Sequence, residues 1–206
     1  MSMIAAVLVV AGASGSATAP DVLMRDYITC AAGVREAQMR TLLDTKADGD
    51  YRAAALSVTD ADKCARSDAA VTAPLLAAFG PERGKFRGMV AEALLKKSKS
   101  VDRLAPLARV STYSAGWSTM SGRPRAVDEM AMCVAATNPA GIRALLATKP
   151  NSSGQRQAFT ALTPSLGVCL AKGYQLDIRP TGLRAALAEA LYHRTYDALP
   201  ATGAGN

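Results

Sequence analysis

The chain has almost no histidine: His193 is the only one among 206 residues. A single imidazole speaks against a histidine-based catalytic triad and against a multi-histidine metal site. His193 falls near the end of the last expected helix, where a basic side chain suits the helix dipole. We therefore expect it to be a solvated residue at a helix end and not a catalytic base.

Other motifs that carry chemistry are also missing. There is no glycine-rich phosphate loop. The Asp-rich stretches "DTKADGD" and "TDADKC" lack the twelve-residue calcium loop with its closing Glu. A four-cysteine zinc site lacks its usual C-x2-C pair. A glycosidase needs two facing carboxylates, and between Pro139 and Arg194 the second unit offers only Asp177 and Glu189. The sequence therefore predicts no cofactor and no metal site.

Aromatic residues are scarce, at 5%, and alanine is abundant. Alanine loses no side-chain entropy in a helix, so this composition favours helices. The formal net charge of +7 is spread along the chain, and its densest run is Lys96-Lys97-Ser98-Lys99. We interpret that run as a solvated helix end and predict no nucleic-acid partner.

The N-terminus is typical of an export signal. The apolar run from Met3 to Ala13 is too short to span a bilayer, and the small residues of "SGSATAP" follow it. We predict a signal peptide at residues 1–19, with a mature chain that begins between Ser16 and Asp21, although a disordered apolar tail is the alternative. No second apolar run reaches spanning length, so we expect a periplasmic or secreted protein without a transmembrane segment in the mature chain.

Four cysteines occur in two copies of one pattern. The segments "TCAAGVREAQMRTLLDTK" and "MCVAATNPAGIRALLATK" align with each other, and so do "FRGMVAEALLKK" and "LRAALAEALYHR". Each copy encloses its own cysteine pair, which selects one of the three possible pairings, Cys30–Cys64 with Cys133–Cys169. Closing loops of this length should stabilise the fold by about 3–4 kcal/mol each.

The repeat predicts an all-α fold made of two tandem, disulfide-stapled helical units. We place unit 1 at residues 20–98, a linker at 99–127 and unit 2 at 128–206, packed about a pseudo-two-fold axis as one domain. Asn138 and Pro139 are typical of a helix start, and "YQLDIRP" indicates a short extended segment. A unit this small and alanine-rich buries too little surface alone, which explains the staple and the second copy.

These residues resemble a group of uncharacterised secreted proteins of alphaproteobacteria. The resemblance is carried by Cys133, Cys169 and the helix at 183–192, with a looser copy at Cys30, Cys64 and 86–95. It covers most of the mature chain and implies an exported helical protein. Its motifs are structural, so it implies no activity and no catalytic residue.

Charged residues recur at matching places in the two terminal helices of the units. Glu92 corresponds to Glu189, and Arg87 corresponds to Arg184. A paired acid can be catalytic, but each Glu also stands four residues before a basic residue, Lys96 or His193, as in ordinary helix-surface pairs. We favour the structural interpretation.

One segment differs from the repeats, "RVSTYSAGWSTMSGRPR" at residues 109–125. An aromatic and basic recognition surface could form there from Arg109, Tyr113, Trp117, Arg123 and Arg125. Alternatively, Trp117 and Tyr113 fill the joint between the units, which we favour. Two functions stay open: a non-catalytic envelope scaffold or binding module for an envelope protein or an anionic glycan or polymer, or an exported hydrolase using Glu92 or Glu189.

Overall fold

The computed structural model describes residues 19–64 and 68–197, and these residues form helices and loops with no strand. The α-helices in the described part are α1 (Ala19–Val34), α2 (Glu36–Asp44), α3 (Asp48–Thr59), α4 (Asp68–Phe79), α5 (Arg83–Lys96), α6 (Arg125–Thr137), α7 (Pro139–Leu146), α8 (Ser153–Cys169) and α9 (Pro180–Tyr196). Short 3-10 helices lie at η1 (Asp62–Cys64), η2 (Ser100–Arg103) and η3 (Gly116–Met120). The predicted all-α class is confirmed.

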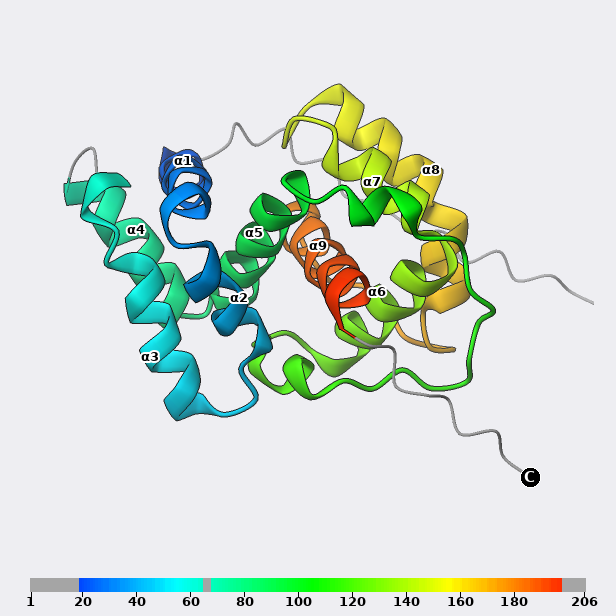
Figure 1. Cartoon of the computed structure of the whole chain (residues 1–206). Helices are drawn as coiled ribbons and strands as arrows, with labels where there is room; N and C mark the ends of the chain where they lie inside the picture. The colour runs from blue at the N-terminus through cyan, green and yellow to red at the C-terminus, as the bar shows by residue number, and fades with distance from the viewer. Residues whose placement is uncertain (1–18, 65–67, 198–206) are drawn as a thin grey trace, which may run out of the picture.

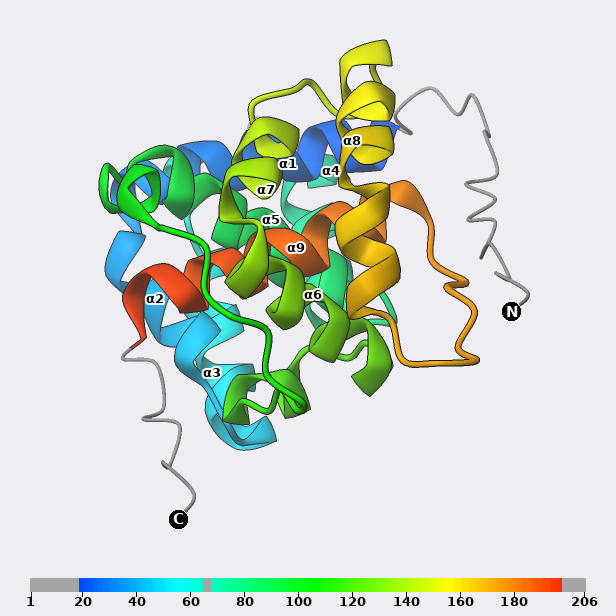
Figure 2. The ribbon, with the colours of Figure 1, turned by 90° about the vertical axis from the view of Figure 1, so that its right-hand side faces the viewer.

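Helices α5 and α9 lie side by side at the centre of the molecule. Helices α1 to α4 lie on one side of this pair and α6 to α8 on the other (Figure 1). The view in Figure 2 shows α9 running across the middle, with α6 beside it. Because both central helices are enclosed, every residue of α9 from Leu183 to His193 is buried.

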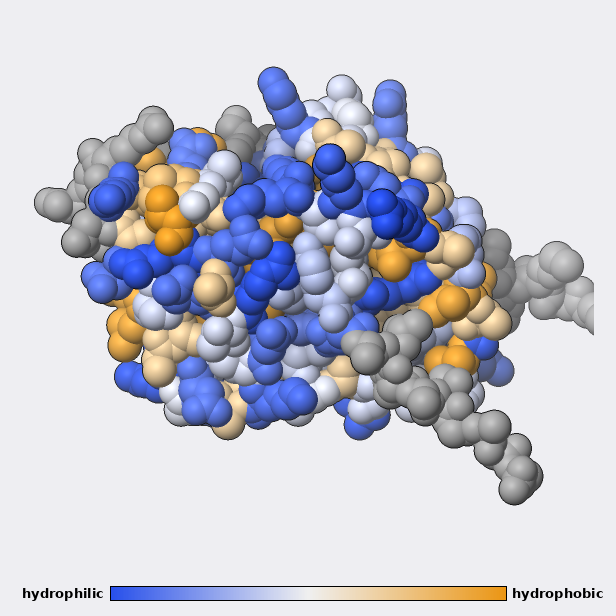
Figure 3. All heavy atoms as spheres, viewed as in Figure 1, coloured by the Kyte–Doolittle hydropathy of each residue, from blue (hydrophilic) through white to orange (hydrophobic). Residues whose placement is uncertain are grey.

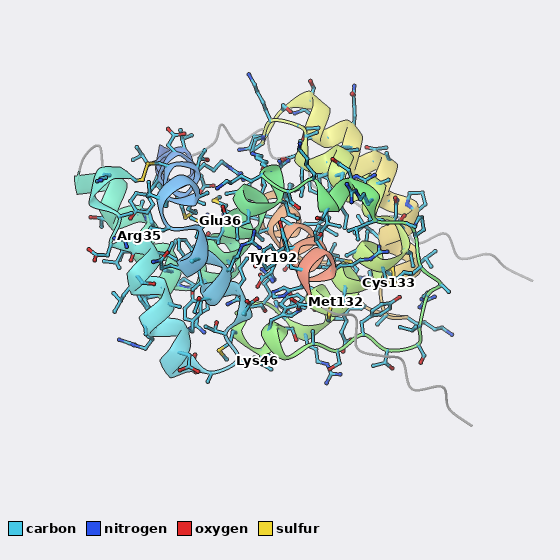
Figure 4. The ribbon with its side chains drawn as sticks, in the orientation of Figure 1. Arg35, Glu36, Lys46, Met132, Cys133 and Tyr192 are labelled. Carbon is cyan, nitrogen blue, oxygen red and sulfur yellow. A yellow bond between two sulfur atoms is a disulfide. The ribbon has the colours of Figure 1, made fainter. Side chains whose placement is uncertain are left out.

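The centre is close-packed because small residues face each other there. A Cβ atom placed on Gly88 of α5 would lie 2.3 Å from the Cβ of Ala185 on α9. Such a distance is far below van der Waals contact, so only glycine allows the two backbones to approach this closely. Figure 4 shows Tyr192 of α9 between Glu36 on the α2 side and Cys133 on the α6 side.

Local sequence signals set several helix ends. The Asn138 side chain accepts a hydrogen bond from the Gly141 backbone N–H at 2.9 Å, with Pro139 in the first turn of α7. Ser152 caps α8 by accepting from the Gln155 N–H at 3.1 Å. The predicted start of α7 is therefore confirmed.

Both predicted disulfides are present, Cys30–Cys64 and Cys133–Cys169. Each one closes within its own unit. The Arg194 guanidinium of unit 2 donates to the carbonyls of Ala105 in the linker and of Ala136 at the end of α6. No helix in the described parts of the chain has both the length and the apolar character needed to cross a membrane.

The structure differs from the sequence prediction in two elements. Helix α4 has no counterpart in the second half, where residues 171–179 contain no helix. The "YQLDIRP" segment lies in that stretch and forms no strand, since no neighbouring segment pairs with it. The predicted signal peptide lies outside the described residues except for Ala19, the first residue of α1. The pseudo-two-fold relation of the whole units stays a prediction.

The contact at Gly88 generates a test of the central packing. Gly88→Ala should destabilise the protein by about 1–3 kcal/mol, because the added methyl group overpacks the core against Ala185. Gly167→Ala in α8 is the matched control, since no atom lies within 4 Å of its added Cβ. That control should be neutral or stabilising by up to about 1 kcal/mol. Urea unfolding of both variants measures the difference, and equal stabilities would contradict the close approach of α5 and α9.

Candidate functional site

The recurring Arg and Glu residues of the sequence form buried ion pairs between the central helices. Arg87 of α5 donates from Nε to Glu189 of α9 at 2.7 Å, and both side chains have 0% exposure. Arg184 of α9 donates from Nε and Nη2 to the two carboxylate oxygens of Glu92 on α5, at 2.9 and 2.8 Å. Each arginine thus pairs with the glutamate of the other unit and not with the glutamate on its own helix.

Each buried arginine also covers the end of a helix in its own unit. Arg87 donates to the carbonyls of Leu42 and Leu43 at the end of α2, at 2.8 and 2.9 Å. Arg184 makes the corresponding bonds to Leu145 and Leu146 at the end of α7, at 2.9 and 3.0 Å. The last carbonyls of a helix lack partners within the helix and carry its negative dipole end. Each buried arginine therefore supplies hydrogen-bond donors to these carbonyls and a positive charge to the negative end of the helix dipole.

The arginines hold both glutamates in the ionised form. Burial alone would raise the pKa of Glu92, but hydrogen bonds from Arg184 and its charge outweigh burial and lower the pKa to about 2. Burial acts in the same way on Glu189, and the charges of Arg87 and Arg123 lower its pKa below the usual value. A general acid needs a raised pKa, so this environment opposes that role.

The placement of the two glutamates corrects the surface interpretation. Glu92 does lie 3.1 Å from Lys96, as the spacing predicts, yet its side chain is only 3% exposed. Glu189 is fully buried. The surface interpretation was wrong because it treated each helix alone, whereas the other unit covers the glutamate face. Neither carboxylate is presented to solvent.

A second buried group extends the Glu189 pair. Arg123 donates to Glu189 at 2.5 Å and to Asp128 at 2.7 Å, and also to the Gly84 carbonyl at 2.7 Å. The Ser121 hydroxyl donates to Asp128 at 2.5 Å. Burial raises the pKa of Asp128 against the opposing charge of Arg123. The linker is therefore tied to both central helices through Arg123, which is not a surface residue.

The predicted burial of Trp117 is confirmed, with 4% exposure. Its ring stacks on the imidazole of His193, with centroids 4.5 Å apart and planes within 5°. His193 is itself only 4% exposed, so the expectation of a solvated histidine was wrong. The linker folds back over the end of α9 and places Trp117 on the His193 ring. The sequence of α9 alone does not predict this contact.

The other residues of the linker segment lie apart from this buried pair. Arg109 and Arg125 are exposed, and Arg125 pairs with Glu129 at 2.5 Å. Tyr113 is half-buried, and its hydroxyl accepts a hydrogen bond from the Val110 N–H at 3.2 Å. Of the five candidate binding residues, only these two arginines present their charge largely to solvent.

The structure also contains charged clusters that the sequence analysis did not single out. Ser121 and Asp128 form one with Arg123. Another consists of Asp44, His193 and Asp197, whose potential ligand atoms all lie within 4.8 Å of one another. One signal was available for the central pairs: the middle of each terminal helix is apolar on nearly all sides yet carries an Arg and, five residues later, a Glu, which indicates buried charges with external partners.

We compared the chain with protein-family models, with curated proteins and with solved structures, and none of them matches it. The candidate site is therefore interpreted from its own chemistry.

The central ion pairs predict a specific loss of stability. Glu92→Gln leaves Arg184 buried without its full counter-charge and should cost about 3–5 kcal/mol in urea unfolding at neutral pH. The control Glu36→Gln removes an exposed ion pair with Arg40 and Lys97 and should cost no more than about 1 kcal/mol.

The same pair has a defined pH dependence. The pKa of Glu92 falls from 4.5 to about 2 on folding, so its ion pairs contribute fully above about pH 4.5 and are lost as the pH approaches 2. Between about pH 4.5 and pH 2, the free energy of unfolding should therefore fall less in the Glu92→Gln variant than in the unmodified protein. An identical acid profile in the two proteins would contradict the assignment of Glu92 as an ionised, paired residue.

Proposed function

We propose that this protein is a non-catalytic envelope protein, exported to the periplasm or beyond, that acts as a scaffold or binding module. The observation that carries the proposal is the use of the shared charged residues. Glu92 and Glu189 are bonded inside the molecule to Arg184 and Arg87, so the residues that both units share serve packing. The alternative, an exported hydrolase, would depend on these same two carboxylates.

The two disulfides support the assignment to an oxidising compartment. Structural disulfides persist outside the cytosol and are rare within it. Each of the four cysteines is in a disulfide here. The resemblance to secreted alphaproteobacterial proteins and the apolar N-terminal run point the same way.

The surface chemistry favours an anionic polymer as the partner over an apolar protein surface. The formal net charge is +7, and Arg109 and Arg125 are exposed on one linker segment. On the face seen in Figure 3, hydrophilic side chains cover most of the surface and hydrophobic ones lie in small separate groups. A positively charged surface of this kind attracts polyanions, and the attraction depends on salt.

Export can be tested on protein from the native host. Cell fractionation followed by intact-mass measurement should place the protein outside the cytosol, beginning between Ser16 and Asp21, with both disulfides formed. Free thiols should be undetectable before reduction. A cytosolic protein that retains residues 3–13 would contradict the export part of the proposal.

Binding can be tested with dextran sulfate as the polyanion. The double variant Arg109→Gln/Arg125→Gln should elute from a dextran sulfate column at lower salt than the unmodified protein. The control Lys149→Gln/Arg156→Gln removes two exposed charges elsewhere and should shift elution less. Equal shifts would show that only net charge matters and would contradict a binding surface in the linker.

A further inference from the structure

Three side chains with metal-binding atoms converge where α2 and α9 end. Asp44 is the last residue of α2, His193 lies in the last turn of α9, and Asp197 follows that helix. One ligand atom from each lies within 4.8 Å of the other two. Figure 1 and Figure 2 both place the end of α9 beside α2, and the Arg40 guanidinium lies 4.3 Å from the centre of the Tyr196 ring.

The imidazole in this cluster lacks one partner. Its Nδ1 lies 2.8 Å from the Asp197 carboxylate, but Nε2 is buried and has no hydrogen-bond partner among the described residues. The two ring nitrogens point in nearly opposite directions, so an ion shared with Asp197 would be ligated by Nδ1, while Nε2 stays buried without a partner in the described part of the chain. The unpartnered nitrogen belongs to a side chain that is 95% enclosed, with 5% exposure.

The two carboxylates differ in their partners, since Asp197 lies 2.8 Å from the His193 imidazole and Asp44 has no such pair in the described part of the chain. Asp44 takes part in none of the ion pairs formed within the described residues. The closest arginine on α2, Arg40, is already paired with Glu36 at 2.9 Å. A divalent cation between the carboxylates would remove their repulsion.

The histidine ring is held in a fixed orientation. Trp117 stacks on one face at 4.5 Å, and Tyr192 meets the ring edge-on at 5.2 Å and 86°. The carboxylates are less constrained, since Asp197 is 45% exposed and Asp44 is exposed at a helix end. They can therefore rotate toward an ion while the imidazole stays in place, which reduces the reorganisation that binding requires.

We propose that Asp44, His193 and Asp197 bind a divalent transition metal ion of the zinc type. One imidazole nitrogen and two carboxylate oxygens suit Zn²⁺, Co²⁺ or Ni²⁺, whereas Mg²⁺ and Ca²⁺ prefer oxygen ligands alone. Three protein ligands leave at least one position for water or for a group from a partner. This proposal does not depend on the function proposed above.

Calorimetric titration of the dialysed full chain with Zn²⁺ tests the site. One ion should bind per chain, and Asp44→Asn should weaken the affinity about tenfold or more through loss of a ligand. Asp44 is exposed and unpaired, so this variant should keep the fold. Asp177→Asn, at an exposed aspartate in the 171–179 loop, is the matched control and should bind as the unmodified protein does. Absence of saturable binding, or equal weakening by both variants, would overturn the proposal.

Two spectroscopic signals report on the same ion because the chain has one histidine and one tryptophan. Zn²⁺ should shift the ring-nitrogen resonances of His193 in ¹⁵N NMR, and Ni²⁺ should quench Trp117 emission through the stacked ring. An excess of Mg²⁺ should cause neither change. Zn²⁺ binding that leaves the histidine resonances in place would show that the ion lies elsewhere, and the proposed ligand set would be wrong.

Discussion

Two guanidinium groups, buried between α5 and α9, impose the main constraint on this structure. A buried charge is tolerated only with a counter-charge and with partners for its other donors. Each arginine meets that requirement with a glutamate from the other unit and with the last carbonyls of α2 or α7. The position of those two outer helices relative to the central pair is thereby fixed. The small residues at the centre then allow the two backbones to come close enough for the bonds to form.

The exchange of partners makes the two units dependent on each other. Without α9, Arg87 would keep its α2 carbonyls but lose Glu189, and Arg184 would likewise lose Glu92 without α5. Replacing such a pair with apolar residues is often neutral, so the pairs are weak evidence for high stability. Their role is better described as specificity: an alternative packing of two alanine-rich helices would separate each buried arginine from its glutamate. This gives a physical reason for charge in an otherwise apolar interface.

The sequence predicted what depends on local pattern and failed where distant segments meet. The all-α class, the Asn138 cap and both disulfides follow from composition, spacing and the repeat, and all three are confirmed. Helix α4 was missed because "DAAVTAPLLAAF" is apolar on all sides and gives no amphipathic period. The burial of Glu189 and His193 was missed because their covering groups come from α5 and the linker. The Asp44 cluster joins residues about 150 positions apart, beyond the reach of any local motif.

The path of the covalent chain has a further consequence for the linker. Both disulfides close within their own unit, and neither spans residues 99–127. A single proteolytic cut in the exposed stretch at 105–109 would therefore divide the chain into two separate molecules. The fragments would stay together through non-covalent contacts, among them the α5–α9 packing and the bonds from Arg123 to Gly84, from Arg143 to Val101 and from Arg194 to Ala105. After such a cut, the ion pairs between the units would serve as the connection that the backbone no longer supplies.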